Sequence, residues 1–290
     1  MPGRVHLSKS AFDKALDQNA SKYYRLSIQF SLDGFSFCIY DINRNKFSGI
    51  EIYDFQGVSN YLGLANLIRE FIPKTEWLSL DYESVSIAFE TPVCTLVPSP
   101  LFKDTHANDY LKLNFNLQLD DLIKNDHLSL LDANNIWSIP HNIYKRITKF
   151  FPKAQIHHHA SSLIENLLLH NKNRESGEVV FVNVRKNWFD IVVLDGNKLL
   201  FYNAFRYKAK EDFIYFLIFV LEQLNLNPEI TDVVLLGEVL KISSVYEVAY
   251  KYIRNISFGK RSNDYQYSYV IDEMPEHFYF NLIHLQQCEL

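Results

Sequence analysis

The stretch that decides the fold is VVFVNVRKNWFDIVVLDGNKLLFYNAF, residues 179–205. It contains three apolar runs: Val179–Val184, Trp188–Leu194 and Leu199–Phe205. Polar corners separate the runs, and the second corner, residues 195–197, is Asp-Gly-Asn, which accepts the positive φ of a tight hairpin turn. The stretch therefore predicts three antiparallel strands that lead into a helix beginning at about Lys210.

The same pattern occurs near the start of the chain, in residues 27–55. At an offset of 154 positions the two stretches agree in residue type without gaps, and Gln29 falls on Asn183. Identical pairs include Phe35 with Phe189, Asp41 with Asp195, Asn43 with Asn197 and Phe47 with Phe201. This repeat indicates an internal duplication of a βββα unit. The alternative is that two unrelated three-stranded meanders align this well by chance.

Composition narrows the class of protein. A chain of 290 residues with 48% apolar content can bury one large core or two ordinary ones, and its alternating strand and helix patterns predict an α/β protein. The net charge of −5, without a dense basic run, argues against DNA as a partner.

Three features predict a cytoplasmic location. Cys38, Cys94 and Cys288 are far apart and form no CxxC motif, which is typical of a reducing compartment. The first 20 residues lack the apolar core of a secretion signal. The most apolar run, Phe213–Leu221, is about half the length of a membrane span, so we expect no membrane-spanning segment.

The remaining elements follow from periodicity, caps and breakers. Residues 1–22 are polar and predict a loose arm with a short helix near Phe12–Leu16. Strict alternation over Tyr110–Leu119 predicts a half-buried strand. The other expected strands are Ser84–Phe89, Val93–Val97, one or two within Leu128–Ile139, Gln155–Ala160, Asp232–Leu236 and Tyr265–Ile271. The expected helices are Val58–Ile72, Asn142–Phe151, Ser161–His170, Glu211–Leu224, Ser243–Ile253 and His277–Gln287.

The polar segment 171–177 is the best candidate for a linker. It predicts a first domain over residues 23–172, with an inserted subdomain at about 99–151, and a second domain over residues 177–290.

Two βββ-α-β-α units resemble the duplicated ribonuclease-H-like core of the actin-like ATPase superfamily, which includes actin, hexokinase, the DnaK-type chaperones, FtsA and PilM. The resemblance covers most of the chain and implies two pseudo-symmetric domains with mixed sheets flanked by helices. More narrowly, TPVCTLVPSPLF (91–102) and HHHASSLIENLL (157–168) are similar to an uncharacterised bacterial family with this fold and no known activity.

In active members of the superfamily each meander begins with Asp-x-Gly, and a Gly-Gly pair follows a late strand of the second domain. The aspartate holds hydrated magnesium, and glycine lets backbone N–H groups approach phosphate. The matching positions here are Gln29-Phe30-Ser31, Asn183-Val184-Arg185 and Gly237-Glu238. Amides replace both aspartates, so the resemblance implies a chain without ordinary ATPase chemistry.

We therefore expect a non-hydrolysing binding or scaffold module that acts on another protein, with oligomers possible and no cofactor. The alternative is an ATPase or kinase that binds a nucleotide or sugar phosphate, such as ATP with magnesium, in a non-standard cleft. In the superfamily's arrangement the corners of both halves face one cleft. The positions expected there are Gln29, Ser31, Asp33, Gly34, Asn183, Arg185, Lys186, Gly237 and Glu238.

Charge refines this expectation. Arg185 and Lys186 would occupy the space that phosphates need, while Glu238 would repel phosphates or neutralise Arg185. Asp33-Gly34 offers either a displaced phosphate loop or an ordinary hairpin turn.

The histidine run 157–159 offers a second candidate. His157 and His159 share one strand face, which suits a metal, although no third ligand lies beside them in the sequence. The alternative is a strand edge lined with hydrogen-bonded histidines.

Overall fold

The structure, a computed structural model, describes residues 4–58, 60–174 and 176–287. Cys288, one of the three cysteines of the sequence, lies outside the described residues. Contacts divide the chain into two compact units. The first contains Met1–Asn166, Asn263–Glu273 and Asn281–Leu290, and the second contains Leu167–Ser262 and Met274–Phe280. The C-terminal segments 263–273 and 281–290 thus group with the first unit, which differs from the predicted domain boundary.

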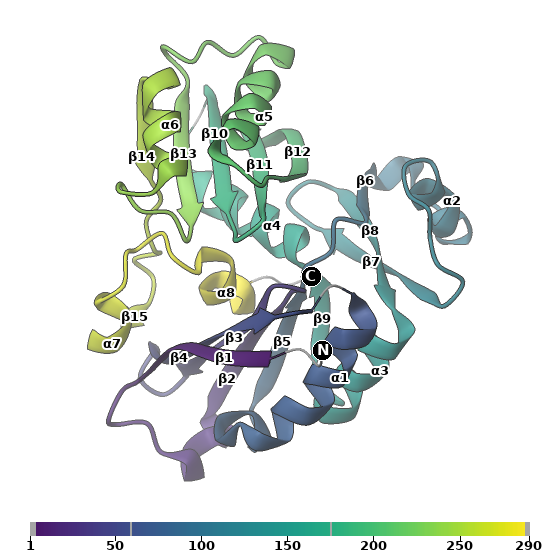
Figure 1. Cartoon of the computed structure of the whole chain (residues 1–290), viewed down its shortest axis with the longest axis vertical. Helices are drawn as coiled ribbons and strands as arrows, with labels where there is room; N and C mark the ends of the chain where they lie inside the picture. The colour runs from purple at the N-terminus through teal and green to yellow at the C-terminus, as the bar shows by residue number, and fades with distance from the viewer. Residues whose placement is uncertain (1–3, 59, 175, 288–290) are drawn as a thin grey trace. The chain divides into compact units, whose positions relative to one another are not determined.

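The first unit is built on a mixed sheet with the strand order β1-β4-β3-β2-β5-β9 (Figure 1). Its strands are β1 (Arg4–Phe12), β2 (Tyr24–Phe30), β3 (Gly34–Asp41), β4 (Lys46–Gln56), β5 (Ser84–Phe89) and β9 (Gln155–His158), and the short β15 (Gln266–Tyr267) also pairs with β4. The helices α1 (Tyr61–Phe71) and α3 (His141–Phe150) pack on it. The Asn60 side chain caps α1 by accepting from the Gly63 N–H.

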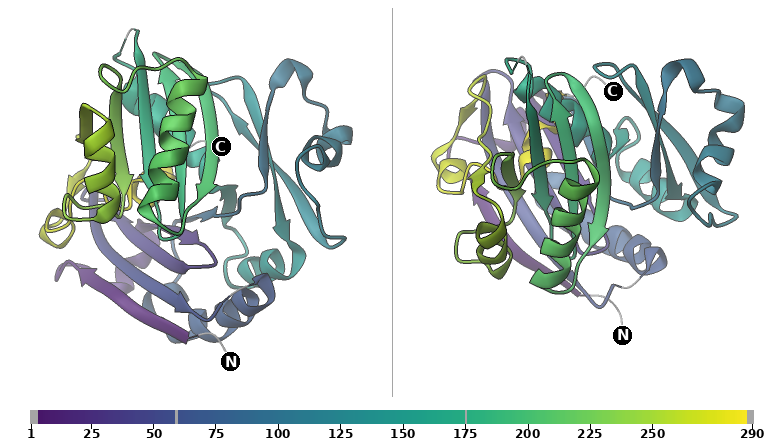
Figure 2. Two further views of the ribbon diagram at one scale, coloured as in Figure 1. Left: turned by 45° about the horizontal axis from the view of Figure 1, so that its top comes forward. Right: turned by 90° about the horizontal axis from the view of Figure 1, so that it is seen from above.

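The second unit has a sheet with the order β12-β11-β10-β13-β14. Its strands are β10 (Glu178–Val184), β11 (Trp188–Asp195), β12 (Lys198–Arg206), β13 (Asp232–Gly237) and β14 (Asn255–Phe258). Two helices, α5 (Lys210–Gln223) and α6 (Ser244–Tyr252), pack beside each other on one face of this sheet (Figures 1 and 2). The chain enters this unit within α4 (His159–Asn171).

The two sheets repeat one another. The order β4-β3-β2-β5-β9 corresponds strand by strand to β12-β11-β10-β13-β14. The bounds of β2 and β3 coincide with those of β10 and β11 at the predicted offset of 154. In both sheets the first two hairpins are antiparallel and the next strand joins in parallel, through β5 and β13. This shared topology confirms the predicted α/β architecture of two pseudo-symmetric halves with mixed sheets.

A small antiparallel sheet, β6-β8-β7, interrupts the first unit. It consists of β6 (Cys94–Pro98), β7 (Asp121–Leu128) and β8 (Ala133–Pro140), and α2 (Ala107–Lys112) packs on it. The insertion therefore begins slightly before the predicted residue 99, and α3 lies within the first core rather than in the insertion.

Three sequence predictions are wrong or hold only in part. Within the predicted loose arm 1–22, Arg4–Phe12 form the edge strand β1 and a 3-10 helix covers Gln18–Tyr23. The side chains of β1 are exposed or half-buried and mostly polar, so this strand carries no apolar period. Residues 110–119 contain the end of α2 and a loop, with only Leu111 fully buried in the small core, while Leu113 and Leu119 are exposed.

The third prediction, a strand at Tyr265–Ile271, holds only for Gln266–Tyr267, which form β15. After β15 the chain turns into α7 (Tyr269–Asp272). The predicted helix His277–Gln287 is shorter, α8 (Phe280–His284) with one further 3-10 turn. The strand β14 lies in a segment for which we predicted none, and β7 lies before the predicted Leu128–Ile139 except for its last residue. Among the described residues no helix has the length and apolar character of a membrane span.

Candidate functional site

The first motif position is the hairpin corner between β2 and β3. The Ser31 N–H donates to the Gly34 carbonyl at 2.9 Å, which closes the turn. The Ser31 hydroxyl oxygen accepts from the N–H groups of Asp33 (3.1 Å) and Gly34 (2.9 Å). These are the backbone donors that a displaced phosphate loop would offer. The serine uses them within the turn, as an ordinary hairpin does.

The glycine of this corner has a structural cause. A Cβ at Gly34 would lie 2.6 Å from the Tyr53 carbonyl oxygen on the paired strand β4. Gln29, at the expected aspartate position, donates from its side-chain amide to the Glu90 carboxylate. The first corner therefore presents a neutral amide bound to a carboxylate of its own unit.

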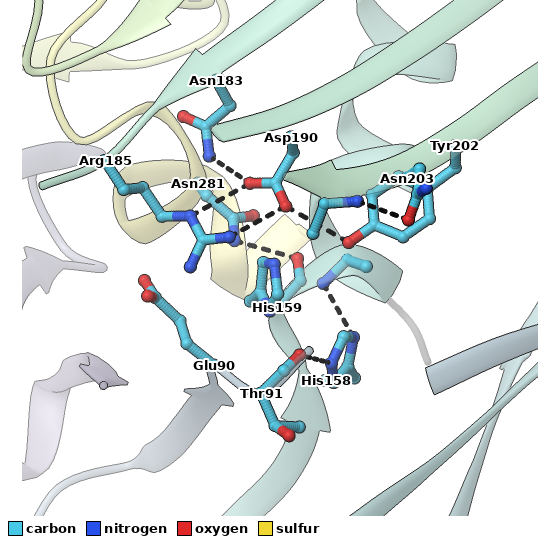
Figure 3. A network of polar contacts seen from close by, with 12 residues as sticks. Glu90, Thr91, His158, His159, Asn183, Arg185, Asp190, Tyr202, Asn203 and Asn281 are labelled. Carbon is cyan, nitrogen blue, oxygen red and sulfur yellow. Dashed lines mark hydrogen bonds and ion pairs between the residues drawn. The ribbon is translucent and has the colours of Figure 1, made fainter. Parts of the chain in front are cut away.

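The second motif position is organised by Asp190, a residue that the sequence reading did not select. Its carboxylate is fully buried and receives hydrogen bonds from three side chains (Figure 3). Arg185 donates through Nε (3.1 Å) and Nη2 (3.0 Å), a bidentate ion pair. The amide of Asn183 donates at 3.0 Å and the Tyr202 hydroxyl at 3.2 Å.

Asn183 and Asp190 face each other because they are directly paired between β10 and β11. In the first unit the equivalent pair is Gln29 with Ser36, so the buried carboxylate belongs to the second repeat alone. A signal was present in the sequence. An aspartate inside the apolar run WFDIVVL must be paired when the strand is buried.

Lys186 lies beside this network, in the exposed loop between β10 and β11. Below it the Tyr207 hydroxyl donates to the Arg185 carbonyl at 2.7 Å, and the Tyr207 N–H donates to the Asn187 carbonyl. Burial raises the pKa of Tyr207, so this hydroxyl keeps its proton and its hydrogen bond. Tyr207 thus fixes this corner with two hydrogen bonds, one from its side chain and one from its backbone.

The third motif position is the turn after β13. Gly237 has φ +81°, and a Cβ there would lie 2.0 Å from the Val184 carbonyl oxygen. The retained glycine is thus required by the parallel pairing of β10 with β13, independently of any ligand. Its N–H donates to the His277 carbonyl at 2.9 Å.

Side chains of residues 277–279 bond the turn after β13. His277 Nε2 bonds the Val239 carbonyl at 2.7 Å, and the His277 ring stacks on Phe258. Burial lowers the pKa of His277, against the raising effect of the bond to Val239. The Tyr279 hydroxyl donates to Glu238 at 3.0 Å.

Glu238 has a counterpart in the first unit. The Glu238 N–H donates to the Val184 carbonyl (3.1 Å), and the Glu90 N–H donates to the Phe30 carbonyl (2.8 Å). Since β2 and β10 correspond residue by residue, the two glutamates occupy the same position in the two repeats. Each accepts a hydrogen bond from a neutral side chain of its own unit. That all these corners face one shared cleft, and that Glu238 neutralises Arg185, stay predictions.

The histidine run forms a buried network in the first unit. The Asp126 carboxylate accepts from the His158 N–H (2.8 Å) and the Ser161 hydroxyl (2.6 Å), and lies 3.3 Å from His157 Nδ1. His158 Nδ1 accepts from the Ala160 N–H and its Nε2 donates to the Thr91 carbonyl at 2.8 Å, so this ring is neutral (Figure 3).

These contacts match the hydrogen-bonded alternative for His157 and His158, which lie in β9. The prediction that His157 and His159 share one strand face is wrong, because His159 is the first residue of α4. In the part of the chain that the structure describes, no three His, Cys, Asp or Glu side chains are grouped as metal ligands. The network joins β7, in the small sheet, to the start of α4.

Comparison with known proteins gives the family. The sequence pattern described as "Protein of unknown function (DUF3822)" matches residues 13–256. The chain belongs to the DUF3822 family. No curated protein matches this DUF3822 sequence significantly.

Among solved structures, one from Bacteroides thetaiotaomicron, titled a protein with actin-like ATPase fold and unknown function, is 25% identical to this DUF3822 chain. It superposes with a TM-score of 0.77 over 94% of this chain and 99% of the other. The PilM–PilN type IV pilus biogenesis complex gives 0.61 at 10% identity, over 91% and 98% of the two chains. The DUF3822 protein therefore has the actin-like ATPase fold, as the sequence resemblance predicted.

Proposed function

We propose that this actin-like-fold protein is a non-hydrolysing binding or scaffold module whose partner is another protein. The observation that carries the proposal is the bidentate pair of Arg185 with the buried Asp190. It stands at the corner where an active member of the superfamily would place the turn that receives phosphate. A guanidinium so held is stabilised by its own carboxylate, and a phosphate would have to compete with that carboxylate for it.

Magnesium binding is disfavoured for a related reason. Magnesium in nucleotide sites is held by one or two carboxylates together with phosphate oxygens. At the two expected aspartate positions this chain has Gln29 and Asn183, whose amide groups donate to Glu90 and Asp190. The amides bring no negative charge, and they already use hydrogen bonds of the neighbouring carboxylates.

The backbone donors of the motifs are also used within each unit. Ser31 accepts from two N–H groups at the first corner. The Gly237 N–H donates to the His277 carbonyl at the third. A ligand would have to break these bonds before gaining its own, so affinity would fall by their free energy.

The remaining parts of the proposal follow from this loss. A protein that has the fold but not the nucleotide chemistry would act through its surface, by binding a partner. The chain is mildly acidic, so a protein fits as this partner better than a nucleic acid does. A reducing compartment such as the cytoplasm is part of the proposal. The Cys38 thiol lies in the core of β3, where burial raises its pKa to about 12 and makes it unreactive.

Isothermal titration with Mg-ATP tests the proposal, together with an assay for released phosphate. We expect no saturable heat and no phosphate release from the natural protein. Micromolar, magnesium-dependent binding, equivalent to about −8 kcal/mol, would refute it.

The matched comparison is a variant that restores the motifs: Gln29→Asp, Asn183→Asp, Arg185→Gly and Glu238→Gly. Arg185→Gly alone is the control, because it removes the guanidinium from Asp190 without supplying the missing groups. Mg-ATP binding by the restored variant and not by the control would support descent from an ATPase.

A further inference from the structure

The helix α5 has apolar residues on faces that do not contact the core of its unit. Its sequence is KEDFIYFLIFVLEQ, and Phe213, Leu217, Val220 and Leu221 bury one face against the second sheet. On the outer side Tyr215 is 63% exposed and Phe219 is 44% exposed. A helix that is apolar all round is normally covered on both sides.

These exposed residues border a groove between α5 and α6. It has a volume of about 350 Å³ and is lined by Ile214, Tyr215, Ile218, Phe219 and Glu222 of α5 and by Tyr252 of α6. The rings of Tyr215 and Phe219 lie nearly parallel with centroids 6.2 Å apart, and Tyr252 is 57% exposed. Aromatic walls of this kind are enriched where proteins bind one another.

The exposed residues Tyr215 and Phe219 form an apolar stripe on α5, and a negatively charged residue lies at each end of this stripe. Glu211 lies one turn before Tyr215 and is exposed, and Glu222 lies one turn after Phe219 and is exposed. Lys210 is next to Glu211 in α5, and Lys251 is next to Tyr252 in α6. Neighbouring residues of a helix are about 100° apart around its axis, so each lysine points away from the direction of the residue beside it. The stripe thus reads as carboxylate, two aromatics, carboxylate.

We propose that this groove binds an amphipathic helix of another protein that carries Lys or Arg at both ends of a short apolar face. Apolar side chains at positions i and i+4 of that helix would enter between Tyr252 and the stacked pair. Its cations would meet Glu211 and Glu222, which would fix its position along the groove. The inference rests on the proposed binding role and names the surface and partner chemistry for it.

The same charges decide against a second copy of this chain. If two α5 helices packed antiparallel about a two-fold axis, Glu211 of one would meet Glu222 of the other. If they packed parallel, each glutamate would meet itself. Both arrangements place like charges together at each end of the contact, which is unfavourable. An anionic membrane surface would meet the same repulsion.

The test uses the full chain and two fluorescein-labelled helical peptides. Both peptides have the same Leu face, and one has Lys flanks where the other has Glu flanks. Anisotropy titrations at low ionic strength should show the Lys-flanked peptide binding about tenfold more tightly. Phe219→Asp should abolish this binding. Tyr23→Asp, at an exposed tyrosine of the first unit, is the matched control and should leave it unchanged.

Charge reversal completes the test. Glu211→Lys with Glu222→Lys should make the Glu-flanked peptide the tighter ligand. The inference fails if the Lys-flanked peptide does not bind, if both peptides bind equally, or if Phe219→Asp binds normally. It also fails if sedimentation shows a dimer, or anionic vesicles bind the chain, and Phe219→Asp removes that association. Titration of the same proteins with Mg-ATP reports separately on the proposed loss of nucleotide binding.

Discussion

Replacing Asp190 by asparagine should destabilise the second unit far more than its size change suggests. The substitution keeps the shape of the side chain and removes one oxygen and the charge. Four hydrogen bonds reach Asp190 from donors: one from Asn183, two from Arg185 and one from Tyr202. An amide at this position turns one of its two acceptors into a further donor, so no rotamer can accept all four of these hydrogen bonds.

The size of the effect follows from this geometry. Two of the four hydrogen bonds end on each carboxylate oxygen, so the amide loses two of them, at about 1–3 kcal/mol for each donor left unpaired. Arg185, whose side chain is only 16% exposed, also loses its counter-ion. Breaking a buried ion pair on one side costs about 3–5 kcal/mol, and we expect a loss in that range.

Urea unfolding followed by tryptophan fluorescence and by circular dichroism measures the loss. The control is Asp232→Asn, which breaks another Arg–Asp pair of the same unit, with Arg174, also at 3.0 Å. Those side chains are 37% and 47% exposed, so that change should cost at most about 1 kcal/mol. The reasoning is refuted if Asp190→Asn costs no more than Asp232→Asn.

Three further perturbations test the corners and the buried network. Gly237→Ala should lower the free energy of unfolding in urea by at least about 3 kcal/mol, because the strain of a positive φ adds to the clash with Val184. Gly57 has a similar φ but open space around it, so Gly57→Ala should cost about 1–2 kcal/mol. Equal costs for the two variants would contradict the steric argument. Since burial lowers the pKa of His277, the stabilising contribution of the neutral ring is present above pH 6.5 and is lost as the pH falls below 6.5. The free energies of unfolding at pH 7.5 and at pH 5.0 should therefore differ less in His277→Gln than in the natural protein. An unchanged difference would count against a buried, neutral His277. Asp126→Ala should cost about 2–4 kcal/mol and Asp126→Asn less than half of that, because the amide oxygen can still accept from the His158 N–H and the Ser161 hydroxyl. Similar costs for both variants would contradict this account.

The sequence predicted the sheets well where apolar runs and turn signals agree. The hairpins at β2–β3 and β10–β11 were found with the correct offset because buried strands cannot shift register without exposing their side chains. The same logic failed for Arg4–Phe12, since an edge strand with exposed side chains has no apolar period to read. It also failed at residues 110–119, where alternating leucines occur in a loop.

The candidate site was only half predictable. The positions Gln29, Asn183 and Gly237 could be found because the repeat fixes where each strand ends. Their partners could not, since pairing across a sheet or between distant segments brings Asp190 and His277 beside them. Asp190 is the instructive omission. It was visible as a carboxylate inside an apolar strand, and its burial made a cationic partner necessary.

The return of residues 263–273 and 281–290 to the first unit bears on how the protein is made. During synthesis the strands β1 to β9 emerge first, yet β4 gains its neighbour β15 only after all strands of the second sheet, β10 to β14, have left the ribosome. The Cys38 thiol likewise meets the Leu282 carbonyl only then. The half that is translated first is therefore completed last, and a nascent chain stalled before residue 263 would hold a finished second sheet beside an unfinished first one.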